Sequence, residues 1–167
     1  AKSDHMHALL VTEFFLRRVQ KTYTTLVVLD PAVTVADEGR VSLPVDGRPA
    51  ESTYRVLERY GTEAALVQVQ TMTGRKHQVR VHCAQGLSSA VVRDTLYGDA
   101  ATVNPAWSLD ADDDDDDSDE QQQPQPERFL LHASSLSIPA LHLHTTEAPL
   151  PAWWTPILDN VQKVCSK

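Results

Sequence analysis

Apolar residues recur at helical spacing near both ends of the chain. A helix is predicted over residues 3–18, where Ser3 or Asp4 can cap the first turn. Another helix is predicted over residues 150–164, in which Pro156 is tolerated only in the first turn. The spacing changes between these two segments, where strand-like sequence takes over.

Alternating and β-branched segments predict strands in the middle of the chain. Residues 21–30, KTYTTLVVLD, are rich in Thr, Val and Tyr and end at an Asp-Pro pair. Residues 52–60 and 64–72 alternate and are joined by a short Gly-Thr connection, which predicts a β-hairpin. Strand-like sequence returns at residues 128–144, and we expect these strands to share one sheet.

The remaining segments carry turn-forming residues. Residues 31–50 contain three prolines and two glycines, which predicts a loop with at most a short strand near Val41 to Leu43. Residues 87–98 are expected to be irregular. The order of helix, strands, helix, strands and helix predicts an α+β fold with a mixed, largely antiparallel sheet and flanking helices.

One acidic segment accounts for the net charge of −8. Residues 108–127 are low in complexity, and we predict a disordered insertion there. Residues 110–127 hold 10 of the 23 acids and no Lys or Arg, so the rest of the chain carries 13 acids and 15 bases. The acidic total therefore does not argue against a nucleic-acid partner. One hypothesis is that the acidic run mimics nucleic acid and occupies a basic groove.

The composition is that of an ordinary globular domain. No apolar run approaches the roughly 20 residues that span a bilayer, and no secretory signal is evident. Two cysteines are too few for a disulfide framework. We therefore expect an intracellular protein in an unspecified compartment, without a membrane association. The absence of an initiating Met indicates that the chain begins within something longer.

The segment TGRKHQVRVH, residues 73–82, concentrates positive charge at the predicted start of a helix. This helix is expected from about Arg75 to Gln85, with Thr73 as its N-cap and Gly86 as its stop. The cationic or potentially cationic residues are Arg75, Lys76, His77 and Arg80. Positive charge at this end opposes the helix dipole, so these residues need another explanation.

No acidic neighbour in the sequence balances this charge. There is no Asp or Glu between Gln68 and Arg93, so acid–base pairs within the helix are excluded. A solvated basic face is one interpretation. The other is an anion from outside the helix, either an RNA or DNA phosphate or a carboxylate from elsewhere in the fold.

Five stretches resemble, in order, the motifs of RluA-type pseudouridine synthases. The strongest is LVQVQTMTGRKHQVRVHCAQG, followed by RDTLYG. The others are AKSDHMHALLVTEFFLRRVQKTYTTLVV, ESTYRVLER, RFLLHASSLSIP and APLPAWW. The resemblance implies that residues 1–167 are part of a pseudouridine synthase catalytic domain, with residues 108–127 as an insertion. It also implies isomerisation of uridine in ribosomal or transfer RNA, with no metal or other cofactor.

The resemblance also assigns roles to individual residues. Tyr23 matches the aromatic residue that stacks on the target base, and Arg80 matches the arginine that pairs with the catalytic carboxylate. The expected RNA-binding or pocket residues are Lys21, Arg75, Lys76 and His77. A guanidinium suits the role of Arg80 because it can hold a carboxylate with two hydrogen bonds.

The sequence departs from the family pattern in two places. The H-R-L-D-like motif that carries the catalytic Asp does not occur, so we expect this chain alone to be inactive. Arg93 stands where the family usually has Gly. The alternative interpretation is a non-catalytic RNA-binding or ribosome-assembly module with the same fold. Exposed sheet edges would also allow self-association without a physiological role.

The histidines offer pairs but no complete metal site. His5 with His7, and His142 with His144, are the closest pairs in the sequence. Neither pair has a third ligand at a recognisable spacing, so we predict no metal.

Overall fold

The computed structural model describes residues 3–98, 129–141 and 143–165. Along these residues the order is one helix, four strands, a short helical segment, two strands separated by a 3-10 helix (Pro139–Leu141), and a final helix. The acidic insertion predicted at 108–127 lies outside the described residues. The predicted α+β class is confirmed, and every strand pair of the sheet is antiparallel.

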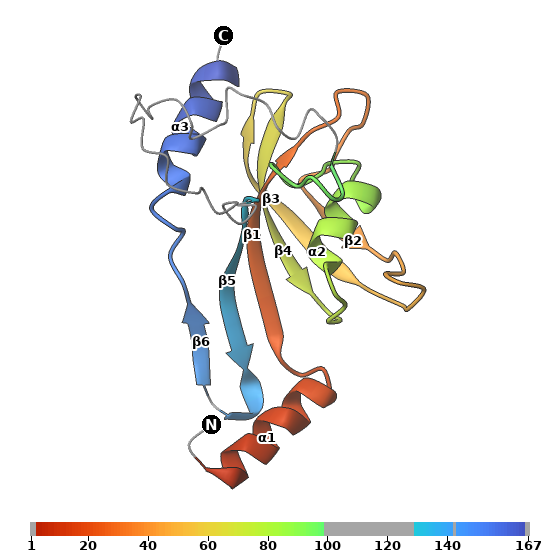
Figure 1. Cartoon of the computed structure of the whole chain (residues 1–167), viewed down its shortest axis with the longest axis vertical. Coiled ribbons are helices and arrows are strands. Elements are labelled where there is room, and N and C mark those ends of the chain that lie inside the picture. Colours follow the sequence, from red (N-terminus) through yellow and green to blue (C-terminus); the bar gives the residue numbers. More distant parts are fainter. Residues whose placement is uncertain (1–2, 99–128, 142, 166–167) are drawn as a thin grey trace, which may run out of the picture.

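Six strands form one twisted sheet in the order β2-β3-β4-β1-β5-β6 (Figure 1). The strands are β1 (Gln20–Val28), β2 (Glu38–Val41), β3 (Ser52–Tyr60), β4 (Ala64–Thr71), β5 (Leu131–Ile138) and β6 (Leu143–Glu147). The predicted hairpin of β3 and β4 is present. The short strand in the first loop is β2, which begins three residues before the predicted position.

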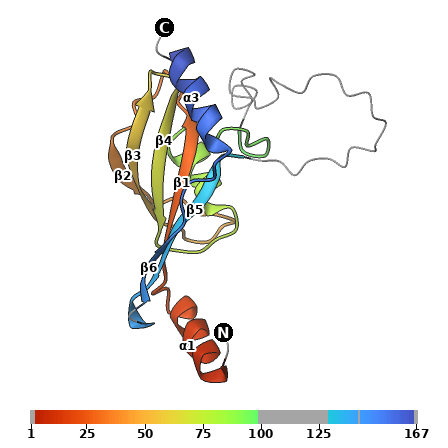
Figure 2. The same cartoon turned by 90° about the vertical axis from the view of Figure 1, so that its left-hand side faces the viewer.

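Two longer helices lie at opposite ends of the sheet (Figures 1 and 2). They are α1 (Asp4–Phe15) and α3 (Trp154–Cys165). The Ser3 hydroxyl accepts a hydrogen bond from the Met6 amide at 3.3 Å, so the predicted cap is confirmed. Pro156 lies in the first turn of α3, as expected. No helix of the described residues has the length and apolar character that crossing a membrane requires.

The sheet has a different core on each face because successive strand residues point to opposite sides. On the α2 face, Val27 and Val67 pack against Val79 of α2 (Gln78–Val81). On the α3 face, Leu26 and Leu66 pack against helix α3. We use the names α2 face and α3 face for these two sides.

The central helix is shorter than predicted. It begins at Gln78, not Arg75, and from His82 to Gly86 it continues as a π-helical turn, η1. Thr73 is not its N-cap, because His77 occupies that position with a left-handed φ of 55°. The first three cationic residues of the basic segment therefore precede the helix and lie in a loop.

Candidate functional site

A pocket of about 240 Å³ opens on the α2 face, between α2 and the central strands. Its walls are Lys21 and Tyr23 of β1, Thr71 of β4, Phe129 and Leu131 near the start of β5, and parts of the 73–80 segment. This volume is below the roughly 300–1,000 Å³ of pockets for drug-sized ligands. The pocket therefore suits a single small group such as one nucleobase.

Gln78 fixes the loop that leads into α2. Its side-chain oxygen accepts hydrogen bonds from the Thr73 hydroxyl at 2.7 Å and the Arg75 amide at 3.0 Å. Its side-chain nitrogen donates to the Glu51 carbonyl at 2.9 Å and the Ser52 hydroxyl at 3.0 Å. All four hydrogen-bonding positions of this buried amide are used, so the loop conformation is strongly specified.

Arg80 and Asp94 form a buried ion pair beside the pocket. The guanidinium donates from Nε and Nη2 to the two carboxylate oxygens, at 2.6 and 2.5 Å. Asp94 is fully buried and also accepts from the amides of Leu96 and Tyr97, both at 3.1 Å. Asp94 is thus a carboxylate from elsewhere in the fold, one of the two anions expected for the basic segment.

Opposing effects set the pKa of Asp94. Burial alone would raise its pKa, but the hydrogen bonds from Arg80, Tyr97 and Leu96 and the charge of Arg80 outweigh burial. The net effect lowers the pKa of Asp94, so the carboxylate is ionised at neutral pH and the pair is locally neutral.

Two aromatic rings hold the Arg80 guanidinium in place. Its central carbon lies 4.3 Å from the ring centre of Phe129 and 5.0 Å from that of Tyr97. The Tyr97 hydroxyl lies 3.1 Å from Nδ1 of His77, which links this cluster to the basic loop. Cation–π contacts of this kind favour a fixed orientation of the guanidinium.

Tyr23 and Lys21 line the pocket from the same strand. Both side chains point to the α2 face because they are two residues apart. Burial raises the pKa of Tyr23, so its phenol is protonated at neutral pH. A methyl group added at Gly74 would lie 3.0 Å from the Lys21 ammonium, so this ammonium lies directly against the basic loop.

Five of the six predicted site residues line this pocket. They are Lys21, Tyr23, Arg75, His77 and Arg80. Lys76 is exposed and does not line the pocket. Sequence reasoning missed Asp94, Tyr97 and Phe129 as neighbours of Arg80. The RDTLYG stretch contained the signal for the first two, because it follows the basic segment within the same motif.

Arg93 explains one departure from the family pattern. Its φ is 65°, in the left-handed region where glycine is unstrained. A non-glycine residue there costs about 1–2 kcal/mol. The backbone therefore keeps the conformation that a glycine would favour, and Asp94 still reaches Arg80.

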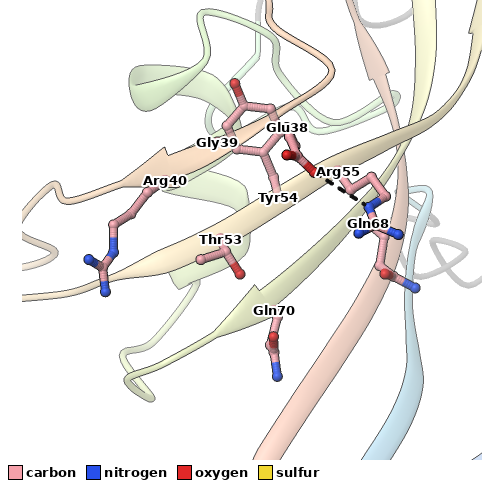
Figure 3. Close-up of a pocket in the computed structure, with 8 residues that line it drawn as sticks. All are labelled: Glu38, Gly39, Arg40, Thr53, Tyr54, Arg55, Gln68 and Gln70. Atoms are coloured by element: carbon pink, nitrogen blue, oxygen red, sulfur yellow. Dashed lines mark ion pairs between the residues drawn. The ribbon is translucent and has the colours of Figure 1, made fainter.

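A second, more open hollow of about 610 Å³ lies on the α3 face (Figure 3). Its polar side chains come from β2, β3 and β4 and include Arg40, Arg55, Gln68 and Gln70. Arg55 pairs with Glu38 across the hollow at 3.9 Å. One aromatic side chain, Tyr54, lines this hollow, but its Arg55–Glu38 pair is exposed to solvent, unlike the buried ion pair beside the first pocket. Among residues 3–98, 129–141 and 143–165, no three His, Cys, Asp or Glu side chains are grouped as a metal site.

Comparisons with known proteins agree on one family. The family model described as RNA pseudouridylate synthase matches residues 1–85. An uncharacterized RNA pseudouridine synthase of Chloroflexus aurantiacus is 36% identical over 59% of this chain and 34% of its own length. Ribosomal large subunit pseudouridine synthase C of Vibrio cholerae is 35% identical over 54% of this chain and 31% of its own length.

A more complete alignment shows a similar relationship. An uncharacterized RNA pseudouridine synthase of Zymomonas mobilis is 29% identical over 93% of this chain and 68% of its own length. The solved structure of human RNA pseudouridylate synthase domain containing 4 superposes with a TM-score of 0.72 and 24% identity. That superposition covers 96% of this chain and 69% of the human chain, and it shows the shared fold. Most of these relatives are matched over only about a third of their length.

Proposed function

Because this chain belongs to the RNA pseudouridylate synthase family, we propose that it is part of an enzyme that converts uridine to pseudouridine in ribosomal or transfer RNA. In this isomerisation the bond from N1 of uracil to C1′ breaks and a bond from C5 to C1′ forms. The proton lost from C5 is balanced by a proton gained at N1. The reaction needs no external energy source, so we propose that it uses no cofactor.

The arrangement around the pocket supports this proposal most directly. Tyr23 presents a protonated aromatic side chain, which would stack on the uracil while allowing it to turn, and its hydroxyl would assist proton transfer. Lys21, Arg75 and His77 lie around the same pocket and would contact RNA phosphates or shape the pocket. Lys76, exposed on the same loop, would contact phosphates further out.

Arg80 would orient the catalytic carboxylate. In the structure, Nε and Nη2 of Arg80 donate hydrogen bonds to the Asp94 carboxylate. A catalytic Asp supplied by a longer protein would then share the guanidinium with Asp94. Because no H-R-L-D-like motif occurs in the 167 residues, we propose that this chain alone does not catalyse the reaction.

The test is conversion of uridine by the longer protein that contains this chain. RNA labelled with tritium at C5 of uridine releases tritium when pseudouridine forms. We expect Arg80→Lys and Tyr23→Phe each to lower kcat by about 100-fold or more, since they remove carboxylate positioning and a proton-transfer group. Arg55→Lys, on the α3 face, is the matched control and should be neutral.

Two results would contradict the proposal. Failure of the longer protein to release tritium from both ribosomal and transfer RNA would reject the activity. Release of tritium by the 167-residue chain alone would reject the claim that the chain is incomplete.

A further inference from the structure

The turn Val45–Arg48 is a rigid feature next to the basic loop. Val45 and Arg48 exchange two backbone hydrogen bonds, each 3.0 Å long. The two central residues, Asp46 and Gly47, have φ values of 51° and 68°. Two consecutive positive φ values define a type I′ turn, for which Asp-Gly is a preferred pair. The position of the Arg48 backbone is therefore well specified.

The base of this turn is anchored in a small core. Val45 and Ala50 are 3% and 6% exposed, and both pack with Val81 of α2. Nε2 of His82 donates to the Leu43 carbonyl at 2.9 Å. The turn is thus held against the same helix that carries Arg80.

Three hydrogen bonds join the residues after this turn to the basic loop. Nε of Arg75 donates to the Pro49 carbonyl at 3.2 Å. The Glu51 amide donates to the Thr73 hydroxyl at 3.0 Å, and the side chain of Gln78 donates to the Glu51 carbonyl. Residues 49–51, which directly follow the turn, are therefore joined to the 73–78 segment that lines the pocket.

These linked segments carry positive charge without matching acids. Arg48 and Lys76 are exposed and Arg75 is half-buried, and none of them has an ion pair with an acid of the described segments. Glu51 is already paired with Arg40. Asp46 is the one acid within the turn. Three cations on rigid, linked loops beside a base-sized pocket suit the phosphates that flank a bound nucleotide.

We infer that Arg48 is a phosphate contact and that the turn Val45–Arg48 is a second RNA-binding loop beside Arg75 and Lys76. This inference rests on the proposed action on RNA. The turn would contact the sugar–phosphate backbone near the target base without reading its sequence.

The test measures binding of the full 167-residue chain to fluorescently labelled single-stranded oligouridine. Fluorescence anisotropy at about 50 mM and about 200 mM salt gives Kd and its salt dependence. We expect Arg48→Ala to raise Kd about threefold at the lower salt concentration, as for an exposed ion pair. The magnitude of the slope of log K against log salt should fall by about 0.7, the value for one phosphate of a single strand.

Control variants separate this contact from a general charge effect. Arg48→Lys should retain most of the affinity. Arg55→Ala removes the same charge from the α3 face and should leave Kd unchanged. The melting temperature of Arg48→Ala should equal that of the wild-type chain, because only an exposed side chain changes.

Three outcomes would overturn the inference. They are unchanged binding by Arg48→Ala, equal losses in Arg48→Ala and Arg55→Ala, and no binding of oligouridine by the wild-type chain. Uridine conversion is not measured in this experiment. A negative result for binding by Arg48 is therefore distinguishable from a negative result for the proposed isomerase activity.

Discussion

At the scale of single residues, the Arg80 guanidinium is held by the Asp94 carboxylate and by the rings of Tyr97 and Phe129. The absence of acids between Gln68 and Arg93 left two interpretations open, a solvated basic face or an anion from outside the helix. The buried pair with Asp94 shows that the second interpretation holds for Arg80. The sequence did not identify Asp94 as that partner, because its position depends on the irregular path of residues 87–98. The contact with Phe129 was not predicted either, because Phe129 lies just before β5, in a segment that is distant from Arg80 in sequence.

Asp94→Asn should destabilise the fold. It leaves the buried guanidinium of Arg80 without its counter-charge, and breaking a buried pair in this way costs about 3–5 kcal/mol. Urea denaturation at neutral pH measures this loss. Asp37→Asn is the matched control, because Asp37 forms an exposed pair with Arg59 and should cost at most about 1 kcal/mol. Equal losses in the two variants would contradict the importance of the buried pair.

The same substitution should change the response to acid. The lowered pKa of Asp94 adds stability above the ordinary value of 3.8, and this contribution is lost as the pH falls through the folded-state pKa. The difference in unfolding free energy between wild type and Asp94→Asn should therefore narrow below about pH 3.8. A constant difference across that range would count against this linkage.

At the scale of elements, strands were predicted better than the central helix. Alternation of side chains predicted β3 and β4, and the Thr-, Val- and Tyr-rich composition of residues 21–30 predicted β1. The helix was predicted to begin at Arg75 because Thr73 is a suitable cap. In the structure the Thr73 hydroxyl instead donates to Gln78, and a local hydrogen-bond network replaces the first helical turn. Such a network depends on Glu51 and Ser52, which sequence spacing does not reveal.

Gln78→Met should loosen the basic loop. Met has a similar length but cannot replace the four hydrogen bonds of the buried amide, so we expect a loss of about 2 kcal/mol or more. Urea denaturation gives the total loss, and hydrogen exchange at the Arg75 amide gives the local effect.

Another glutamine provides the control for this substitution. Gln70 lies in the hollow of the α3 face, and no side-chain hydrogen bond to it is found within the described ranges. Gln70→Met should change stability by no more than about 0.5 kcal/mol. If both variants behave alike, the network around Gln78 does not fix the loop.

At the scale of the whole molecule, the order of motifs was sufficient to identify the family. The inferred membership in the RluA-type pseudouridine synthases is confirmed by the family model and the relatives. The site itself combines β1, the 73–80 segment, residues 94–97 and the start of β5. Antiparallel pairing of β1 with both β4 and β5 brings these segments together. Most of the side chains that line the site were predicted from the sequence, but their contacts with one another were not.

The exposed apolar side chains of α1 predict weak self-association. Phe15 is 84% exposed, Val11 53% and Phe14 51%, and within the described part of the sheet β2 and β6 each have a neighbour on one side only. Sedimentation velocity should show concentration-dependent association of the wild-type chain that Phe15→Asp reduces. Leu57→Asp, at an isolated exposed apolar residue of β3, should not reduce it. Equal effects of both variants would exclude α1 as the contact.

The contrast between the two sides of β4 also protects the sheet against mispairing. Val67 and Val69 enter the core on the α2 face, whereas Gln68 and Gln70 line the polar hollow on the other face. Sliding β4 by one residue against β1 would bury two amides and expose two valines to water. The polar side chains of the hollow in Figure 3 therefore favour the native register of β4 over a register shifted by one residue. This effect does not depend on any ligand.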